Sequence, residues 1–385
     1  MRVAGVEFTQ DEYSLNSVSG RVRIAGNGGA LFFKFHQEDG EQDHVAEYYR
    51  ARLLSDAGLP VEVPVATSSR PGAQVAIYRL RTEPRMADLC VGAERRLGAA
   101  ASLSPELTRA RNDLDDATAQ VMLATLRPPA EESAGTALHQ LFYHRLVDGD
   151  GVFPGGRYRS FYADDPAYAA VAHLRWRVDG VEYADSLSEL AERAAAVLQP
   201  ARLAALPVVT AHGDDHHGNV WAMGEPPGSE GLRLFDPAFA SDDIPALLAP
   251  VKATFHNALA HPFWLYHPDE ADGLGATAQV RDGVVEVATG LRAGPLRRQV
   301  LDSVAERVWA PLLAETARRG WLPADWEQVV RSALFCCPML VTNLMAPARS
   351  PAARWLGLAS SVVAGSRPAS AGTDRVSELL RRVAP

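Results

Sequence analysis

The segment from Ala211 to Asn219 constrains this chain more than any other, because it reads Ala-His-Gly-Asp-Asp-His-His-Gly-Asn. Apolar residues at 206–210 lead into the segment and a second apolar run at 220–223 leads out of it, which indicates a strand on each side. After a turn-rich stretch, a third strand is predicted at 232–236. We therefore expect the loop to lie beside the end of that third strand.

Three oxygen-bearing side chains would meet at this place: Asp214, Asn219 and Asp236. Carboxylate and amide oxygens are ligands that Mg²⁺ accepts in proteins. A further carboxylate can take the proton of a hydroxyl group in phosphoryl transfer. The sequence thus predicts a magnesium site beside a catalytic carboxylate.

The loop resembles that of the aminoglycoside phosphotransferase family, small-molecule kinases related to the protein kinases. The family loop reads His-Gly-Asp-x-His-x-Gly-Asn, followed by a strand that ends in a metal-binding aspartate. Every fixed position is matched here: His212, Gly213, Asp214, His216, Gly218 and Asn219. The chain differs at Asp215, where an apolar residue is usual, at His217, where proline is frequent, and after Asp236, where no glycine follows.

The resemblance implies an α+β, two-lobed, protein-kinase-like fold. We expect a small β-rich nucleotide-binding lobe at 1–83 and a large, mainly helical catalytic and substrate-binding lobe at 84–385, with a helical insertion at about 100–200. The implied reaction moves the γ-phosphoryl group of ATP, or of GTP, to a hydroxyl of a small molecule of antibiotic, sugar or amino-alcohol type.

The same resemblance gives the loop residues their expected roles. Asp214 would be the catalytic base, and Asn219 and Asp236 would hold Mg²⁺. His212 and His216 would be structural, bonding the loop to its surroundings.

Lysine is rare in this chain, which contains Lys34 and Lys252 among 38 lysines and arginines. Where arginine serves for most cations, a retained lysine suggests a need for a compact charge. Lys34 lies in a predicted strand, which by itself would fit a solvated lysine on a hairpin. The scarcity of lysine and the loop downstream favour the role that the resemblance implies, in which Lys34 holds the nucleotide phosphates. Glu47 would pair with it, and Glu41 and Glu38 are alternatives.

Further nucleotide contacts are expected from the small lobe. Ser19 lies on the strand that precedes Lys34. Arg79, Leu80 and Arg81 end the last predicted strand of the lobe, where their backbone groups would meet the purine.

In the large lobe, helices are predicted near 86–99, 104–126, 135–147, 185–198, 295–319, 324–346 and 350–364, with hairpins at 175–183 and 280–287. A further helix is predicted from Asp242 or Asp243 to about Ala260. Lys252 lies in it and is expected to be solvated, with a role near the acceptor as the alternative. The segment at 158–162 reads Tyr-Arg-Ser-Phe-Tyr. Its side chains would either line a substrate pocket or belong to the scaffold.

Composition narrows the class of protein. The net charge of −9 disfavours nucleic acid as the main partner. No apolar run approaches the ~18 residues of a membrane span, and the N-terminus lacks an apolar signal core, so we expect a cytoplasmic protein. Cys90, Cys336 and Cys337 lack zinc or redox spacing, and the adjacent pair is expected as small core residues of an apolar helix.

Two other functions fit parts of the sequence. The cluster from His212 to His217 could serve a metal-dependent hydrolase, although the order of its residues differs from the familiar His-x-His-x-Asp-His pattern. A pseudokinase that binds nucleotide without turnover is the second. Neither the acceptor nor the oligomeric state follows from the sequence.

Overall fold

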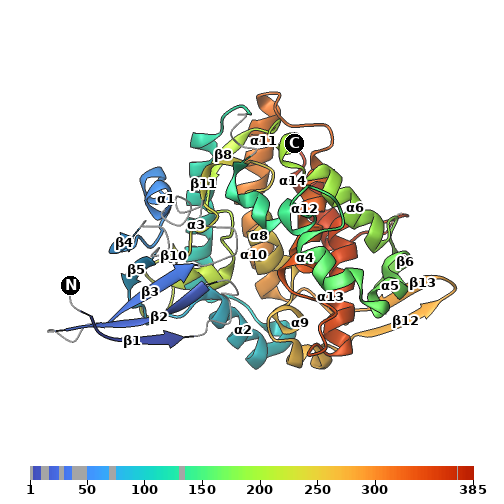
Figure 1. The fold of residues 1–385 in the computed structure, drawn as a ribbon, viewed down its shortest axis with the longest axis horizontal. Coiled ribbons are helices and arrows are strands. Elements are labelled where there is room, and N and C mark those ends of the chain that lie inside the picture. The colour runs from blue at the N-terminus through green and yellow to red at the C-terminus, as the bar shows by residue number, and fades with distance from the viewer. Residues whose placement is uncertain are drawn as a thin grey trace.

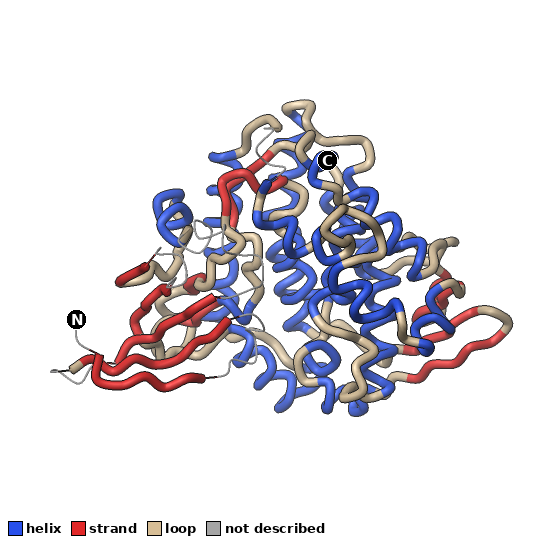
Figure 2. The backbone as a smooth tube through the Cα atoms, viewed as in Figure 1, coloured by secondary structure: helices blue, strands red, loops and turns tan. Residues whose placement is uncertain are grey.

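A β-rich part and a larger helical part make up the fold (Figure 1; Figure 2). The computed structural model describes residues 3–9, 17–25, 30–36, 50–68, 75–129, 135–370 and 372–385. The N-terminal strands lie at one end of the molecule and most of the helices at the other (Figure 2).

The N-terminal part is built on an antiparallel sheet of five strands in the order β1-β2-β3-β5-β4. The strands are β1 (Val3–Thr9), β2 (Ser17–Ile24), β3 (Ala30–His36), β4 (Ala66–Ser68) and β5 (Val75–Arg79). Lys34 is paired in register with Ser19 on one side and with Ala76 on the other. Helix α1 (Ala51–Ala57) precedes β4 in the chain.

Four short strands lie next to the loop from His212 to Asn219: β8 (Val208–Ala211), β9 (Val220–Ala222), β10 (Leu232–Leu234) and β11 (Ser241–Pro245). The three strands predicted next to the loop are confirmed, and β9 and β10 pair antiparallel. The helix predicted to begin at Asp242 or Asp243 is wrong at its start. Residues 241–245 instead form β11 and pair with β8, whose buried backbone groups need hydrogen-bond partners.

Helix α8 (Val251–Thr254) begins only after β11 and continues as a π-helical turn, η9 (Phe255–Leu259). The other helices are α2 (Met86–Leu97), α3 (Pro105–Thr125), α4 (Gly156–Tyr158), α5 (Pro166–Ala172), α6 (Leu187–Val197), α7 (Pro200–Leu203), α9 (Pro262–Leu265), α10 (Pro295–Val304), α11 (Ala310–Arg318), α12 (Trp326–Val341), α13 (Pro351–Gly365) and α14 (Arg375–Val383). The segment at 135–147 forms short 3-10 turns, η5 (Ala137–Leu141) and η6 (Tyr143–Arg145), instead of the predicted helix.

The two hairpins predicted in the helical part are confirmed, and they join into one sheet. β6 (Arg175–Val178) and β7 (Val181–Glu182) form the first, and β12 (Thr277–Arg281) and β13 (Val284–Ala288) form the second. Strand β13 pairs with β6 in parallel. This sheet lies at the end of the molecule far from the N-terminal sheet (Figure 1).

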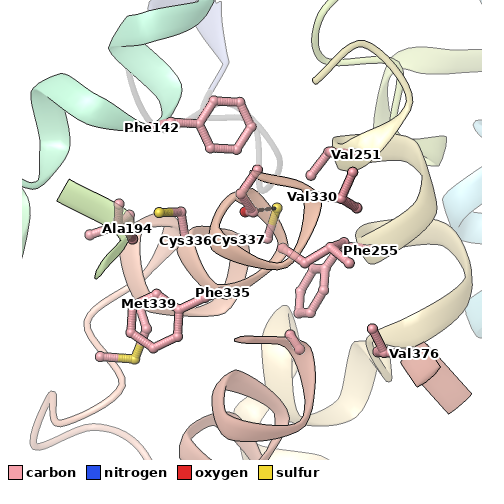
Figure 3. Packing of buried hydrophobic residues seen from close by; sticks show 14 of the residues in the cluster. Phe142, Ala194, Val251, Phe255, Val330, Phe335, Cys336, Cys337, Met339 and Val376 are labelled. Atoms are coloured by element: carbon pink, nitrogen blue, oxygen red, sulfur yellow. Dashed lines mark hydrogen bonds between the residues drawn. The ribbon is translucent and has the colours of Figure 1, made fainter. Parts of the chain in front are cut away.

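The main core gathers around α12 (Figure 3). Cys336 and Cys337 are buried there, as the sequence predicted, and burial raises the pKa of Cys337 to about 12. Tyr158 and Tyr162 are also buried in this core, so they belong to the scaffold instead of lining a substrate pocket. None of the helices in the described ranges combines the length and the apolar character needed to span a membrane.

The predicted fold class is confirmed: the protein is α+β, with a β-rich N-terminal part and a larger, mainly helical C-terminal part. The lobe boundary after residue 83 and the insertion at about 100–200 stay predictions.

Candidate active site

His212 and Asn219 fix the position of Asp236 from two sides. The His212 Nδ1 accepts a hydrogen bond from the backbone N–H of Asp214 (3.3 Å), so its Nε2 carries the proton and donates to the carbonyl oxygen of Phe235 (2.9 Å). The N–H of Phe235 donates to the carbonyl oxygen of Asn219 (3.0 Å). The backbone just before Asp236 is therefore tied to both ends of the loop.

Asp236 itself has a φ of +58°, which is uncommon for a residue other than glycine. Such backbone conformations are concentrated at functional sites, where the surrounding structure enforces them. Here the bonds on Phe235 supply that enforcement, and the Asp236 carboxylate lies at the ammonium group of Lys34.

The loop also closes on itself. His216 Nδ1 accepts a hydrogen bond from the N–H of Gly218 (3.1 Å), and its carbonyl oxygen accepts one from the N–H of Asn219 (2.8 Å). The side-chain amide of Asn219 donates to the carbonyl oxygen of Asp214 (2.9 Å). The asparagine and the first aspartate are thus held at a fixed separation.

Asp214 lies in a largely buried, cationic environment. Its side chain is 15% exposed, with Lys252 Nζ 3.3 Å from Oδ1 and His216 Nε2 4.0 Å from Oδ2. The contact with Lys252 is an ion pair without hydrogen-bond geometry, so Oδ1 has no hydrogen-bond partner among the described residues. Burial acts to raise the pKa of Asp214, but the nearby positive charge, that of Lys252 above all, outweighs it, and the pKa is lowered.

The expectation of a solvated Lys252 is wrong. Only 4% of the residue is exposed, because α8 starts later than predicted and its first turn packs behind the loop. Lys252 Nζ also contacts His256 Nε2 at 3.1 Å.

A cavity between the sheet and the loop is lined by every described residue that we expected at the nucleotide or the metal: Ser19, Lys34, Arg79, Leu80, Arg81, Asn219 and Asp236. Lys34 is buried and forms an ion pair with Asp236. Asp214 does not line this cavity, but it is joined to it through the amide of Asn219. The site therefore has a cavity with a lysine and a carboxylate at its edge, and a second carboxylate next to that edge.

The expected partner of Lys34 is Glu47. Glu47 lies outside the described residues, and so do the alternatives Glu41 and Glu38. Among the described residues, Lys34 forms an ion pair with Asp236.

The aromatic wall of the cavity was not predicted from the sequence. The rings of Trp221 and Phe235 stack with a centroid separation of 4.5 Å and an interplanar angle of 19°, and the Arg85 guanidinium lies 5.5 and 5.6 Å from them. Phe32 and Tyr78 line the cavity from the sheet. The pairing of β9 with β10 brings Trp221 and Phe235 together, a register that the residue pattern alone does not give.

A buried glutamate was also missed. Glu62 lines the cavity and forms an ion pair with Arg81 at 2.5 Å, with Arg233 at 3.6 Å. It lies in an irregular stretch that is hydrogen-bonded to β10 through the N–H of Glu62 and the carbonyl oxygen of Leu234. No local pattern marks such a position in advance.

The two unusual loop residues, Asp215 and His217, differ in their surroundings. His217 is buried against the scaffold, where its N–H donates to Asn257 Oδ1 (2.7 Å) and its ring contacts Cys90 and Arg111. Burial raises the pKa of Asp215, and its Oδ1 has no partner in the part of the chain that the structure describes. His217 thus serves to attach the loop to α2 and α3.

The described residues include no group of three or more His, Cys, Asp or Glu side chains that could hold a metal ion. Each histidine of the loop instead contacts another part of the protein. His212 and His216 bond to backbone groups, and His217 contacts the scaffold.

No protein-family model and no curated protein matches the sequence. Among solved structures, a microcompartment-associated aminopropanol kinase has a TM-score of 0.44 and 13% identity, with 94% of each chain covered. APH(2")-IIia in complex with GDP and kanamycin has a TM-score of 0.41 and 14% identity over 88% of this chain and 85% of its own. Spectinomycin phosphotransferase in complex with ADP and spectinomycin has a TM-score of 0.38 and 14% identity, with 94% of each chain covered. The chain is similar to these proteins with TM-scores below 0.5. Similarity at this level does not assign their activities or their substrates to this chain.

Proposed function

We propose that this protein is a phosphotransferase that moves the γ-phosphoryl group of ATP, or of GTP, to a hydroxyl of a small molecule. The observation that carries the proposal is the meeting of Lys34, Asn219 and Asp236 at one cavity, with Asp214 held beside it by the Asn219 amide. A cation for phosphates, oxygen ligands for a metal and a carboxylate for a hydroxyl are the parts that phosphoryl transfer requires.

The nucleotide fits the cavity with its base toward the aromatic wall. Trp221 and Phe235, which stack on each other, would contact the base from one side, and Phe32 and Tyr78 line the cavity from the sheet. The backbone at 79–81 would meet the edge of the purine, and Ser19 and Lys34 would meet the phosphates. This placement is supported by the cavity lining, and it leaves ATP and GTP as alternatives.

Asn219 and Asp236 suit Mg²⁺ as ligands because they offer an amide and a carboxylate oxygen at the same cavity. The ion pair between Asp236 and Lys34 supports this, since it shows that the carboxylate already faces a cation. When bound, Mg²⁺ would neutralise charge on the phosphate oxygens and help to orient the transferred group.

Asp214 would act on the acceptor. Its side chain is 15% exposed and its lowered pKa keeps it ionised, so it can accept the proton of a hydroxyl. The hydroxyl oxygen forms the new bond to the γ-phosphorus. The bond from that phosphorus to the β–γ bridging oxygen breaks, and its electron pair leaves on the nucleoside diphosphate.

The bonding of the loop histidines supports this function over a metal-dependent hydrolase. His212 Nε2 donates to a backbone carbonyl, and His216 Nδ1 accepts a backbone N–H. These are the structural roles that the resemblance implies for both residues. A histidine engaged in this way has fewer nitrogen lone pairs left for zinc.

The test is a turnover screen with Mg²⁺ and ATP or GTP against a panel of hydroxyl compounds that includes aminoglycosides, amino alcohols and sugars. We expect nucleoside diphosphate release with at least one acceptor class. Asp214→Asn should lower the turnover by roughly 10²–10⁴-fold, because that is what a positioned base contributes.

The binding of Mg²⁺ and nucleotide by Asp214→Asn is the control, and it should be retained. Nucleotide binding by the wild type without turnover on any panel compound would favour the pseudokinase. Turnover that survives in Asp214→Asn would overturn the role of the base.

A further inference from the structure

We propose that Lys252 is a positioning residue of this enzyme, which holds the Asp214 carboxylate in place from the helix behind the loop. The inference rests on the proposed phosphotransfer and adds to it a residue that the loop motif does not contain. It is carried by the ion pair, by the contacts that fix Lys252 and by the attachment of its helix to the loop.

Both lysines of the chain end at the candidate site, although arginine supplies 36 of its 38 long basic side chains. Lys34 pairs with Asp236, and Lys252 pairs with Asp214. Each of the two carboxylates that we assign to phosphoryl transfer thus faces one ammonium group. A compact ammonium fits beside a carboxylate in a confined space, where the fork of an arginine needs more room.

Lys252 is itself held in place. Its Nζ donates to His256 Nε2 (3.1 Å), and His256 Nδ1 donates to the hydroxyl of Tyr266 (2.6 Å). Burial, followed by the charge of Lys252, lowers the pKa of His256 well below its usual value, so the ring is neutral and can accept from the ammonium. These hydrogen bonds, from Tyr266 through His256 to Lys252, therefore direct the ammonium toward Asp214.

The helix that carries Lys252 is anchored on both faces. Val251 and Phe255 belong to the buried cluster around α12 (Figure 3). On the loop side, Asn257 Oδ1 accepts the N–H of His217 (2.7 Å), and the ring of His256 lies 5.5 Å from that of His216. Lys252, His256 and Asn257 thus bind the loop to the core of the helical part.

The geometry also leaves Asp214 able to react. Lys252 lies 3.3 Å from the buried Oδ1 and balances the charge of the carboxylate, while the side chain as a whole stays 15% exposed and keeps Oδ2 for the proton of a hydroxyl. Without Lys252 the carboxylate would stay largely buried and lose its nearest cation. It would then turn away or take up a proton, and either change removes the base.

The experiment is a double-mutant cycle on Asp214→Asn and Lys252→Met, with transfer of the γ-phosphoryl group of Mg²⁺-ATP to water as the reaction. We expect Lys252→Met to lower kcat by about tenfold or more, with the KM for ATP changed by less than about twofold. In the Asp214→Asn background, Lys252→Met should cause no further loss, because Lys252 acts through Asp214. Losses that multiply in the double variant would overturn the inference.

Urea unfolding of the same four proteins tests the pair without any need for turnover. The double variant should be more stable than Lys252→Met alone, because it no longer contains an unpaired buried carboxylate. Arg331→Met is the matched control: it also removes a buried cation from an ion pair, with Glu327, and it should lower stability without changing kcat.

The outcomes separate the two proposals. Asp214→Asn and Lys252→Met could be coupled in the free energy of unfolding while their losses in kcat multiply in the double variant. The pair would then be merely structural, and the positioning role would be overturned. If wild-type protein neither binds nor hydrolyses ATP or GTP in the presence of Mg²⁺, the proposed function fails and the inference falls with it, even where the coupling in stability remains.

Discussion

The two sides of the candidate site are built in different ways. The sheet side rests on a small cluster, in which the described residues Ala76, Tyr78 and Phe32 pack together, while Phe8 of β1 is 71% exposed. The loop side rests on two large clusters, and its histidines and Asn219 are buried and hydrogen-bonded. Regions with few buried apolar contacts open more readily than regions with many. We infer that the loop is fixed before ligands arrive and that the sheet gains more from the nucleotide.

The largest effect should come from crowding the loop at Gly213. Its φ is +80°, and an added Cβ would lie 2.7 Å from the carbonyl oxygen of Phe239. We expect Gly213→Ala to lower the free energy of unfolding by on the order of 3 kcal/mol, because it combines backbone strain with a collision against backbone. Urea unfolding measures this change.

Gly231→Ala is the matched control, since Gly231 also has a positive φ, +91°, but has no atom within 4 Å of its added Cβ. It should cost only about 1–2 kcal/mol. Equal effects of the two substitutions would contradict the view that the loop is the tightly packed side of the site.

A smaller effect is expected on the sheet side, from Lys34→Met. Loss of a charged hydrogen bond to a phosphate weakens binding by about 1.5–3 kcal/mol, which is roughly 10–100-fold in the dissociation constant for Mg²⁺-ATP. Isothermal titration calorimetry measures this constant. Arg23→Met, which removes an exposed cation from β2 of the same sheet, should leave it unchanged. A similar loss in both variants would mean that Lys34 acts through general charge alone.

The smallest effect per residue should be that of pH on the free energy of unfolding. It arises from buried histidines on the loop side. Burial lowers the pKa of His216 and of His261 to about 4, from 6.5. Both are neutral in the folded protein near pH 6, whereas the unfolded chain binds protons below pH 6.5. Stability is therefore complete above pH 6.5 and is lost as the pH falls toward 4, by about 0.8 kcal/mol per histidine at pH 6.

Thermal unfolding from pH 7.5 to pH 5 checks this dependence at constant ionic strength. His261→Gln removes one of the histidines and should make the dependence on pH shallower. A midpoint that rises as the pH falls would contradict the assigned burial of these rings.

The sequence predicted the parts of the site that a local motif carries. The loop and the strands beside it follow from consecutive residues, and so does the position of Asp236 after β10. The motif could not predict Lys252, because its burial depends on β11 replacing the first turns of an expected helix and on packing against α12. Trp221 and Glu62 were missed for a similar reason, since pairing between distant segments places them at the cavity.

The central claim is that the cavity between the sheet and the loop binds a nucleotide with Mg²⁺ at Asp236, and thermal unfolding tests it most directly. Wild type and Asp236→Ala would be heated with and without ATP, each with and without Mg²⁺. At ~100 times its dissociation constant, the ligand should stabilise the wild type by roughly 2.7 kcal/mol, a visible rise in midpoint. We predict a rise that requires Mg²⁺ and is much reduced in Asp236→Ala. No rise with ATP or GTP in the wild type, or an equal rise in Asp236→Ala, would contradict the claim.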